Sequence, residues 1–186
     1  MIKVMVLDDK ITQIDKIIKN LENDSILDNK YKFEACFLNS EGIKFDKYIA
    51  QLRKYLEDFF EKDYKYLLLD MDLCGKKFKS REPLGLIEID DLIKNNIYFK
   101  TLEKKEKFII FISIYTNDVN TLTQNEKWKP DMYYATCKPD ATNSFTVDNC
   151  NRKECSLYSE YSNGVKLCTK NCLAVLLKDL ENGGTY

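Results

Sequence analysis

Two hydrophobic patterns alternate along this chain. Short continuous apolar runs are typical of buried β-strands. Between them, apolar residues recur at three- and four-residue steps, as they do on the buried face of a helix. The predicted strands are residues 2–7, 31–38, 64–70, 108–114 and 132–137. The predicted helices are residues 10–23, 43–62, 84–97, 117–127 and 172–180.

Three of the predicted helices have a well-defined apolar face, which we expect to pack on a sheet. In the first helix this face consists of Ile11, Ile14, Ile17, Ile18 and Leu21. In the second it consists of Phe45, Ile49, Leu52, Leu56, Phe59 and Phe60. In the third it consists of Leu86, Ile89, Ile93 and Ile97.

The alternation of strands and helices determines the expected fold. Strands joined by right-handed helical crossovers form a parallel sheet with helices on both faces, and ligands bind at the carboxyl ends of the strands. The length of 186 residues suits one domain, residues 1–186, with one core. Two stretches do not fit a minimal fold of this kind: 73–83, and a cysteine-rich insertion at 140–170 between the fifth strand and the last helix.

The composition excludes several classes of protein. With 44% hydrophobic and 32% charged residues, and only 6 Gly and 3 Pro, disorder is not expected. The net charge of -1 gives no bulk attraction to nucleic acid. No apolar run reaches the roughly 20 residues that cross a bilayer, and the first ten residues do not form a signal peptide, so we expect a cytoplasmic protein. The chain has no histidine, which excludes Ser-His-Asp and Cys-His catalysis and a phosphohistidine donor.

Polar residues follow the predicted strands where a ligand would bind. Asp8 and Asp9 end the first strand, Asp70 the third and Ser113 the fourth, while the fifth runs into Lys138. Three carboxylates in one crevice repel each other unless a cation neutralises them, and carboxylate oxygens suit Mg²⁺ or Mn²⁺. An aspartate in such a site can act as a nucleophile toward a phosphoryl group. The alternative is that the acids only cap the first helix or lie in a solvated turn.

These residues resemble those of the receiver domains of bacterial response regulators. The segments VLDD, LLLDMDL, FIS and CKP occur in the order of that family. The resemblance covers about residues 1–139 and resumes at the closing helix. It implies a flavodoxin/CheY-like α/β fold, in which a doubly wound five-stranded parallel sheet has the order 2-1-3-4-5 and helices on both faces.

The resemblance also implies roles for individual residues. Asp70 would be the phosphoacceptor, and Asp8, Asp9 and Asp70 would hold Mg²⁺ together with the backbone carbonyl of Asp72. Ser113 and Lys138 would bind the phosphoryl oxygens, and the peptide bond that joins Lys138 to the following proline would be cis.

The expected function is that of a stand-alone receiver in two-component signalling. A histidine kinase, a phosphotransfer protein or a small phosphodonor would phosphorylate Asp70, and the phosphoprotein would act through contacts with a downstream protein partner. The chain is too short for a DNA-binding output domain. The expected chemistry is phosphoryl acceptance with self-dephosphorylation, rather than catalysis on other molecules.

Two other functions stay open. Ile114 stands where the family usually has a small residue, and Ala135 where it often has an aromatic one. These departures favour an interaction module that never turns over phosphate. The segment LLLDMDL also contains the DxD of haloacid dehalogenase-type phosphatases, with Asp70 as nucleophile and Asp72 as general acid. Strand order argues against the phosphatase, because Asp8 and Asp9 open the chain instead of ending the catalytic core.

Cysteines provide a second candidate metal site. Four of them, Cys150, Cys155, Cys168 and Cys172, have the spacing C-x4-C-x12-C-x3-C, and two such pairs can hold Zn²⁺ tetrahedrally. A structural zinc ion would stabilise the polar insertion, which cannot bury enough surface by itself. Cys137 could replace one ligand. The alternative is that these cysteines are free thiols in a surface insertion, with Cys172 buried on the closing helix. We expect Cys36 and Cys74 to be isolated packing residues.

Overall fold

The computed structural model describes residues 1–71, 73, 83–94, 96–113, 124–129, 131–137, 158–162, 165–168 and 172–183. Five parallel strands form its main sheet, and their order is β2-β1-β3-β4-β5. The strands are β1 (Ile2–Asp8), β2 (Tyr31–Phe37), β3 (Tyr66–Asp70), β4 (Phe108–Ser113) and β5 (Tyr133–Cys137). Each lies within one residue or two of its predicted bounds, and the expected flavodoxin/CheY-like order is confirmed.

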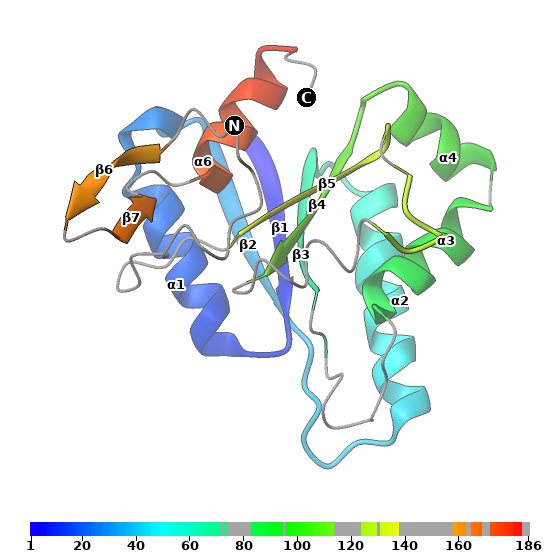
Figure 1. Ribbon diagram of the computed structural model, residues 1–186. Coiled ribbons are helices and arrows are strands. Elements are labelled where there is room, and N and C mark those ends of the chain that lie inside the picture. The colour runs from blue at the N-terminus through cyan, green and yellow to red at the C-terminus, as the bar shows by residue number, and fades with distance from the viewer. Residues whose placement is uncertain are drawn as a thin grey trace.

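Helices cover both faces of this sheet (Figure 1). Helices α1 and α6 lie on one face, and α2, α3 and α4 lie on the other. Their bounds are α1 (Ile11–Glu22), α2 (Phe45–Glu61), α3 (Leu84–Ile93), α4 (Asn96–Glu103) and α6 (Cys172–Glu181), and a short 3₁₀ helix, η1 (Ser25–Leu27), precedes β2. The doubly wound arrangement that the alternation predicts is therefore present.

Each face of the sheet has its own hydrophobic core. Successive side chains of a strand point to opposite faces, so Val4 and Val6 pack with α1 and α6, while Met5 and Leu7 pack with α2, α3 and α4. All four side chains are buried. Because both faces of the central strands are covered, these strands are continuously apolar up to the polar residues at their carboxyl ends.

The third predicted helix is wrong in its extent. The structure has two helices, α3 and α4, where one helix over residues 84–97 was expected. The sequence has two asparagines at 95–96, and asparagine favours helix ends over helix interiors. Ile97 consequently lies on α4, with 71% of its surface exposed, instead of on the apolar face of α3.

Two residues of the predicted apolar faces are also exposed. Ile11 and Phe45 are the first residues of α1 and α2, and their exposed fractions are 46% and 43%. A first-turn side chain packs on the sheet only if it points inward, and in α2 Tyr48 does so and is completely buried. The predicted apolar face of this helix did not include Tyr48.

A second, two-stranded antiparallel sheet lies within the cysteine-rich insertion. It consists of β6 (Tyr158–Ser162) and β7 (Val165–Cys168), which no pattern in the sequence predicted. The predicted helix at 117–127 falls largely outside the described residues, and its described part, 124–127, forms turns.

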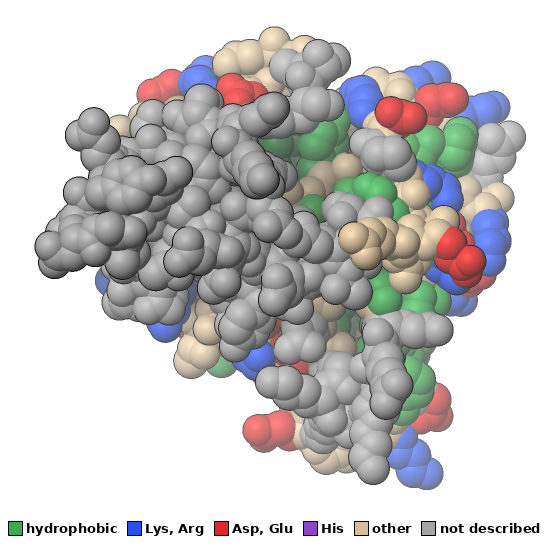
Figure 2. All heavy atoms as spheres, viewed as in Figure 1, with side chains coloured by type: hydrophobic (Ala, Val, Ile, Leu, Met, Phe, Trp, Pro, Cys, Tyr) green, Lys and Arg blue, Asp and Glu red, His purple; other side chains and the backbone are tan. Residues whose placement is uncertain are grey.

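The surface matches the low net charge. In the view of Figure 2, acidic and basic side chains are interspersed over the described surface. Among the helices that the structure describes, none is both long and apolar enough to cross a membrane.

Candidate functional site

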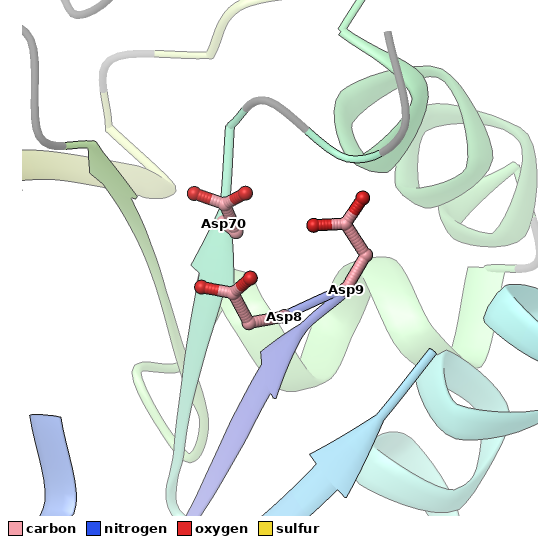
Figure 3. Close-up of side chains that lie close together, drawn as sticks. All are labelled: Asp8, Asp9 and Asp70. Atoms are coloured by element: carbon pink, nitrogen blue, oxygen red, sulfur yellow. The ribbon is translucent and has the colours of Figure 1, made fainter. Parts of the chain in front are cut away.

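Three aspartates meet at the carboxyl edge of the sheet (Figure 3). Strands β1 and β3 are neighbours, and their register pairs Leu7 with Leu69. The next residues, Asp8 and Asp70, therefore lie side by side on adjacent strands. Asp9 follows directly at the end of β1, and its carboxylate lies with the other two in the close-up view.

The three carboxylates are close and largely buried. One oxygen from each of Asp8, Asp9 and Asp70 lies within 4.8 Å of the others. Asp8 is completely buried and Asp70 is 3% exposed, whereas Asp9 is partly exposed. The structure thus brings together the three acids that the sequence analysis assigned to Mg²⁺.

Asp8 also organises the turn that leads into α1. One of its carboxylate oxygens accepts a hydrogen bond from the backbone N–H of Lys10 at 2.9 Å. Lys10 is the N-cap residue of α1, and its own side chain does not cap the helix. Neither Asp8 nor Asp9 is therefore the N-cap residue, although Asp8 accepts a backbone N–H at the start of α1. This bond also fixes the position of the Asp8 side chain in the cluster.

Electrostatics make a cation the natural partner of this cluster. Two unit charges 4.8 Å apart repel each other by about 3.5 kcal/mol at an effective dielectric constant of about 20. Magnesium binds oxygens at about 2.1 Å, which places neighbouring ligand oxygens about 3 Å apart and opposite ones about 4 Å apart. The three carboxylates are spaced on the scale that one divalent cation bridges, and an all-oxygen donor set suits Mg²⁺ or Mn²⁺.

Ser113 lies beside the acids on the next strand. Asp70 pairs with Ile112, and Ser113 pairs with Cys137 on β5, so Ser113 stands one residue beyond Asp70 at the same edge. Its side chain is 2% exposed. Lys138, which follows Cys137 directly, lies outside the described residues, as do Asp72 and Ile114.

A glycine that the sequence analysis missed brings α3 against the strand that carries Asp70. A Cβ atom built on Gly85 would lie 2.7 Å from Cδ2 of Leu69, the residue before Asp70. Real Cβ atoms do not approach other atoms so closely, so a larger residue at this position would require Leu69 or α3 to shift. A glycine in an apolar helical pattern is the signal that could have identified this contact.

The cysteines are described only in part. Cys168 is the last residue of β7 and Cys172 the first of α6, whereas Cys150, Cys155 and Cys74 lie outside the described residues. Cys36 is a buried free thiol in the core, as expected for an isolated cysteine. Burial, followed by the charges of Glu34 and Asp58, raises its pKa to about 11.

Comparison with known proteins gives no match to a family model, a curated protein or a solved structure. The geometry of the acidic cluster defines what the site can do. Three clustered carboxylates can bind a divalent cation, and a buried aspartate carboxylate in such a cluster can accept an electrophilic group.

Proposed function

We propose that this chain is a receiver module of the response-regulator type, which binds Mg²⁺ through Asp8, Asp9 and Asp70 and accepts a phosphoryl group on Asp70. The observation that carries the proposal is the register of β1 and β3, which sets Asp8 beside Asp70, with Asp9 completing a buried carboxylate cluster at the ligand-binding edge of a 2-1-3-4-5 sheet. Ser113 on the adjacent strand supports it.

The chemistry of phosphorylation follows from these positions. A carboxylate oxygen of Asp70 attacks the phosphorus atom of the donor, the bond from phosphorus to the donor's leaving atom breaks, and the electron pair leaves with that atom. A bound divalent cation would offset the negative charge on the carboxylate and phosphoryl oxygens. Ser113 would donate a hydrogen bond to a phosphoryl oxygen, and Lys138 would supply a positive charge.

Partners follow from the same proposal. The donor would be a histidine kinase, a phosphotransfer protein or a small phosphodonor in the cytoplasm, because the chain lacks a histidine of its own. Output would take place through a downstream protein, since the near-zero net charge does not favour nucleic acid.

Intact-mass spectrometry tests this function. The wild type, Asp70→Asn and the control Asp15→Asn would each be incubated with Mg²⁺ and acetyl phosphate. Asp15 is an exposed acid of α1 outside the cluster. We expect one phosphate adduct in the wild type and in Asp15→Asn, and none in Asp70→Asn or in the presence of EDTA. An adduct that persists in Asp70→Asn would rule out this acceptor.

A second candidate function is a receiver-like interaction module whose surface is a zinc-stabilised loop. The observation that favours it is the β6–β7 hairpin, because β7 ends on Cys168 and α6 begins four residues later at Cys172. Zinc would be held by these two cysteines with Cys150 and Cys155. Metal analysis of protein purified without chelator tests this proposal. One zinc per chain, lost in Cys168→Ser and retained in Cys36→Ser, would support it, and metal-free wild type would refute it.

A further inference from the structure

The outer edge of β2 is not paired with another strand in the part of the chain that the structure describes. Strand β2 lies at one end of the main sheet (Figure 1), and its neighbour there is β1. All seven residues of β2 pair with β1 in unbroken register. An edge strand of this length and regularity presents backbone groups to which another strand can bond.

The ladder between β2 and β1 shows which backbone groups point outward. The carbonyl of Lys30 accepts a hydrogen bond from β1, and the N–H of Leu38 donates one to β1. Alternate residues of a strand bond to the same neighbour, so the even-numbered residues of β2 bond to β1. Tyr31, Phe33 and Ala35 therefore direct both their N–H and their C=O groups away from the sheet.

Two charged side chains lie between these outward-facing residues. Lys32 and Glu34 are 55% and 31% exposed, and they form an ion pair at 2.8 Å within β2. The hydroxyl of Tyr64 donates a hydrogen bond to the other carboxylate oxygen of Glu34 at 2.6 Å. A lysine on an edge strand commonly prevents other strands from pairing with it. Here Glu34 offsets the charge of Lys32, so the two side chains together do not repel a strand that carries both charges.

The order of charges along β2 suits a second copy of the same strand. In an antiparallel pair with a two-fold axis at Phe33, Lys32 of each copy lies opposite Glu34 of the other copy. An axis at Glu34 would set two glutamates opposite each other, and an axis at Lys32 would set two lysines opposite each other. Of these three alignments, the axis at Phe33 is the one that pairs opposite charges without opposing like charges.

The other residues of β2 fit the same alignment. The axis places Phe33 opposite its own copy and Tyr31 opposite Ala35. Tyr31 and Phe33 stack with ring centroids 6.2 Å apart, and Ala35 is exposed, which leaves room for a tyrosine ring beside it. Because these three residues direct their backbone groups outward, each of these pairs can exchange both N–H···O=C hydrogen bonds.

We propose that this chain forms a two-fold dimer through antiparallel pairing of β2, which joins the five-stranded sheets of two copies into one continuous sheet. In the dimer Glu34 keeps its hydrogen bond from Tyr64, and Lys32 of the second copy replaces Lys32 of the same chain as its ion-pair partner. The inference is independent of the proposed function, because the interface uses no residue of the acidic cluster.

Sedimentation velocity tests the dimer. As the protein concentration rises to about 0.5 mM, because small interfaces bind weakly, we expect the wild type to approach twice the chain mass of 21.9 kDa. Lys32→Glu and Glu34→Lys each set like charges opposite each other. Each should weaken dimerisation by at least about fourfold, the lower limit for two cross-strand pairs that change from attraction to repulsion. Lys100→Glu, at an exposed position of α4, is the matched control and should dimerise like the wild type.

A mixture of the two variants separates this pairing from a general effect of charge or of folding. Lys32→Glu and Glu34→Lys carry complementary charges at the interface, so an equimolar mixture should form a heterodimer at concentrations at which each variant alone is monomeric. A wild type that stays monomeric over the whole concentration series would overturn the inference. So would a dimer that neither variant weakens, or a mixture of the variants that does not associate.

Discussion

Replacing Asp9 with asparagine should stabilise the protein in a chelator and weaken its response to Mg²⁺. Asp9 is the partly exposed member of the cluster, so the substitution keeps the shape of the side chain and removes one of three mutually repelling charges. The repulsion of about 3.5 kcal/mol per pair is weakened by solvent screening, because Asp9 is partly exposed. We therefore expect removal of the Asp9 charge to relieve roughly 1–2 kcal/mol of repulsion with Asp8 and Asp70 together. The substitution also removes the attraction of the carboxylate to the start of α1, which reduces the expected stabilisation by about 0.5 kcal/mol.

The net gain of about 1 kcal/mol corresponds to a rise in Tm of roughly 2–4 °C for a chain of this size. Magnesium should cancel this difference in stability. At ten times its Kd, Mg²⁺ stabilises the wild type by about 1.4 kcal/mol, whereas tenfold weaker binding to Asp9→Asn leaves about 0.4 kcal/mol. The difference between the two proteins should therefore close when Mg²⁺ replaces the chelator.

Urea unfolding in EDTA and in Mg²⁺ measures both effects, with Asp15→Asn as a control for loss of one negative charge outside the cluster. If Asp9→Asn is less stable than the wild type in EDTA, the protein itself already compensates the Asp9 charge. The repulsion argument would then be refuted. A difference between the proteins that is the same in EDTA and in Mg²⁺ would show that Asp9 is not a ligand.

Three further predictions concern packing and titration. Gly85→Ala should lower the free energy of unfolding by about 1–2 kcal/mol, because its methyl group overlaps Leu69, and Leu69→Ala should relieve part of this overlap in a double-mutant cycle. Arg53→Met should lower the free energy of unfolding, measured in urea, by about 1–2 kcal/mol, because it leaves the largely buried Glu88 without its ion pair with Arg53. Adding Glu88→Gln to this variant should recover stability. The raised pKa of Cys36 should lower the free energy of unfolding as the pH rises from about 9 toward 11, because the unfolded chain loses the thiol proton first. Peptide mapping after alkylation at pH 9 should show Cys36 protected in the folded protein and modified in urea. Equal modification in both states would contradict the raised pKa.

The strands and the acidic cluster could be predicted from the sequence because both depend on local pattern. Buried parallel strands are continuously apolar, so the polar residue that ends each one is visible, and parallel strands bring those ends to one edge. Asp8, Asp70 and Ser113 were identified on this basis, and the structure brings them to the same edge.

Contacts between distant segments could not be predicted in this way. The pairing of Asp90 with Lys129 depends on how α3 packs against the segment before β5, which neither periodicity nor spacing specifies. The break between α3 and α4 lies in an otherwise helical apolar pattern, and the exposure of Phe45 depends on where α2 begins relative to the sheet. Side-chain placement of this kind is determined by tertiary packing.

The pairing of β1 with β3 has a consequence for how the protein folds. Hydrophobic burial forces the two strands into register, and that register brings Asp8 beside Asp70 only when both strands are in place. A slip of one residue would turn Asp8 to the other face of the sheet. A divalent cation bound at this site, as we propose, would therefore stabilise one strand alignment among the compact alternatives, and it would favour the correctly aligned sheet during folding as well as in the folded protein.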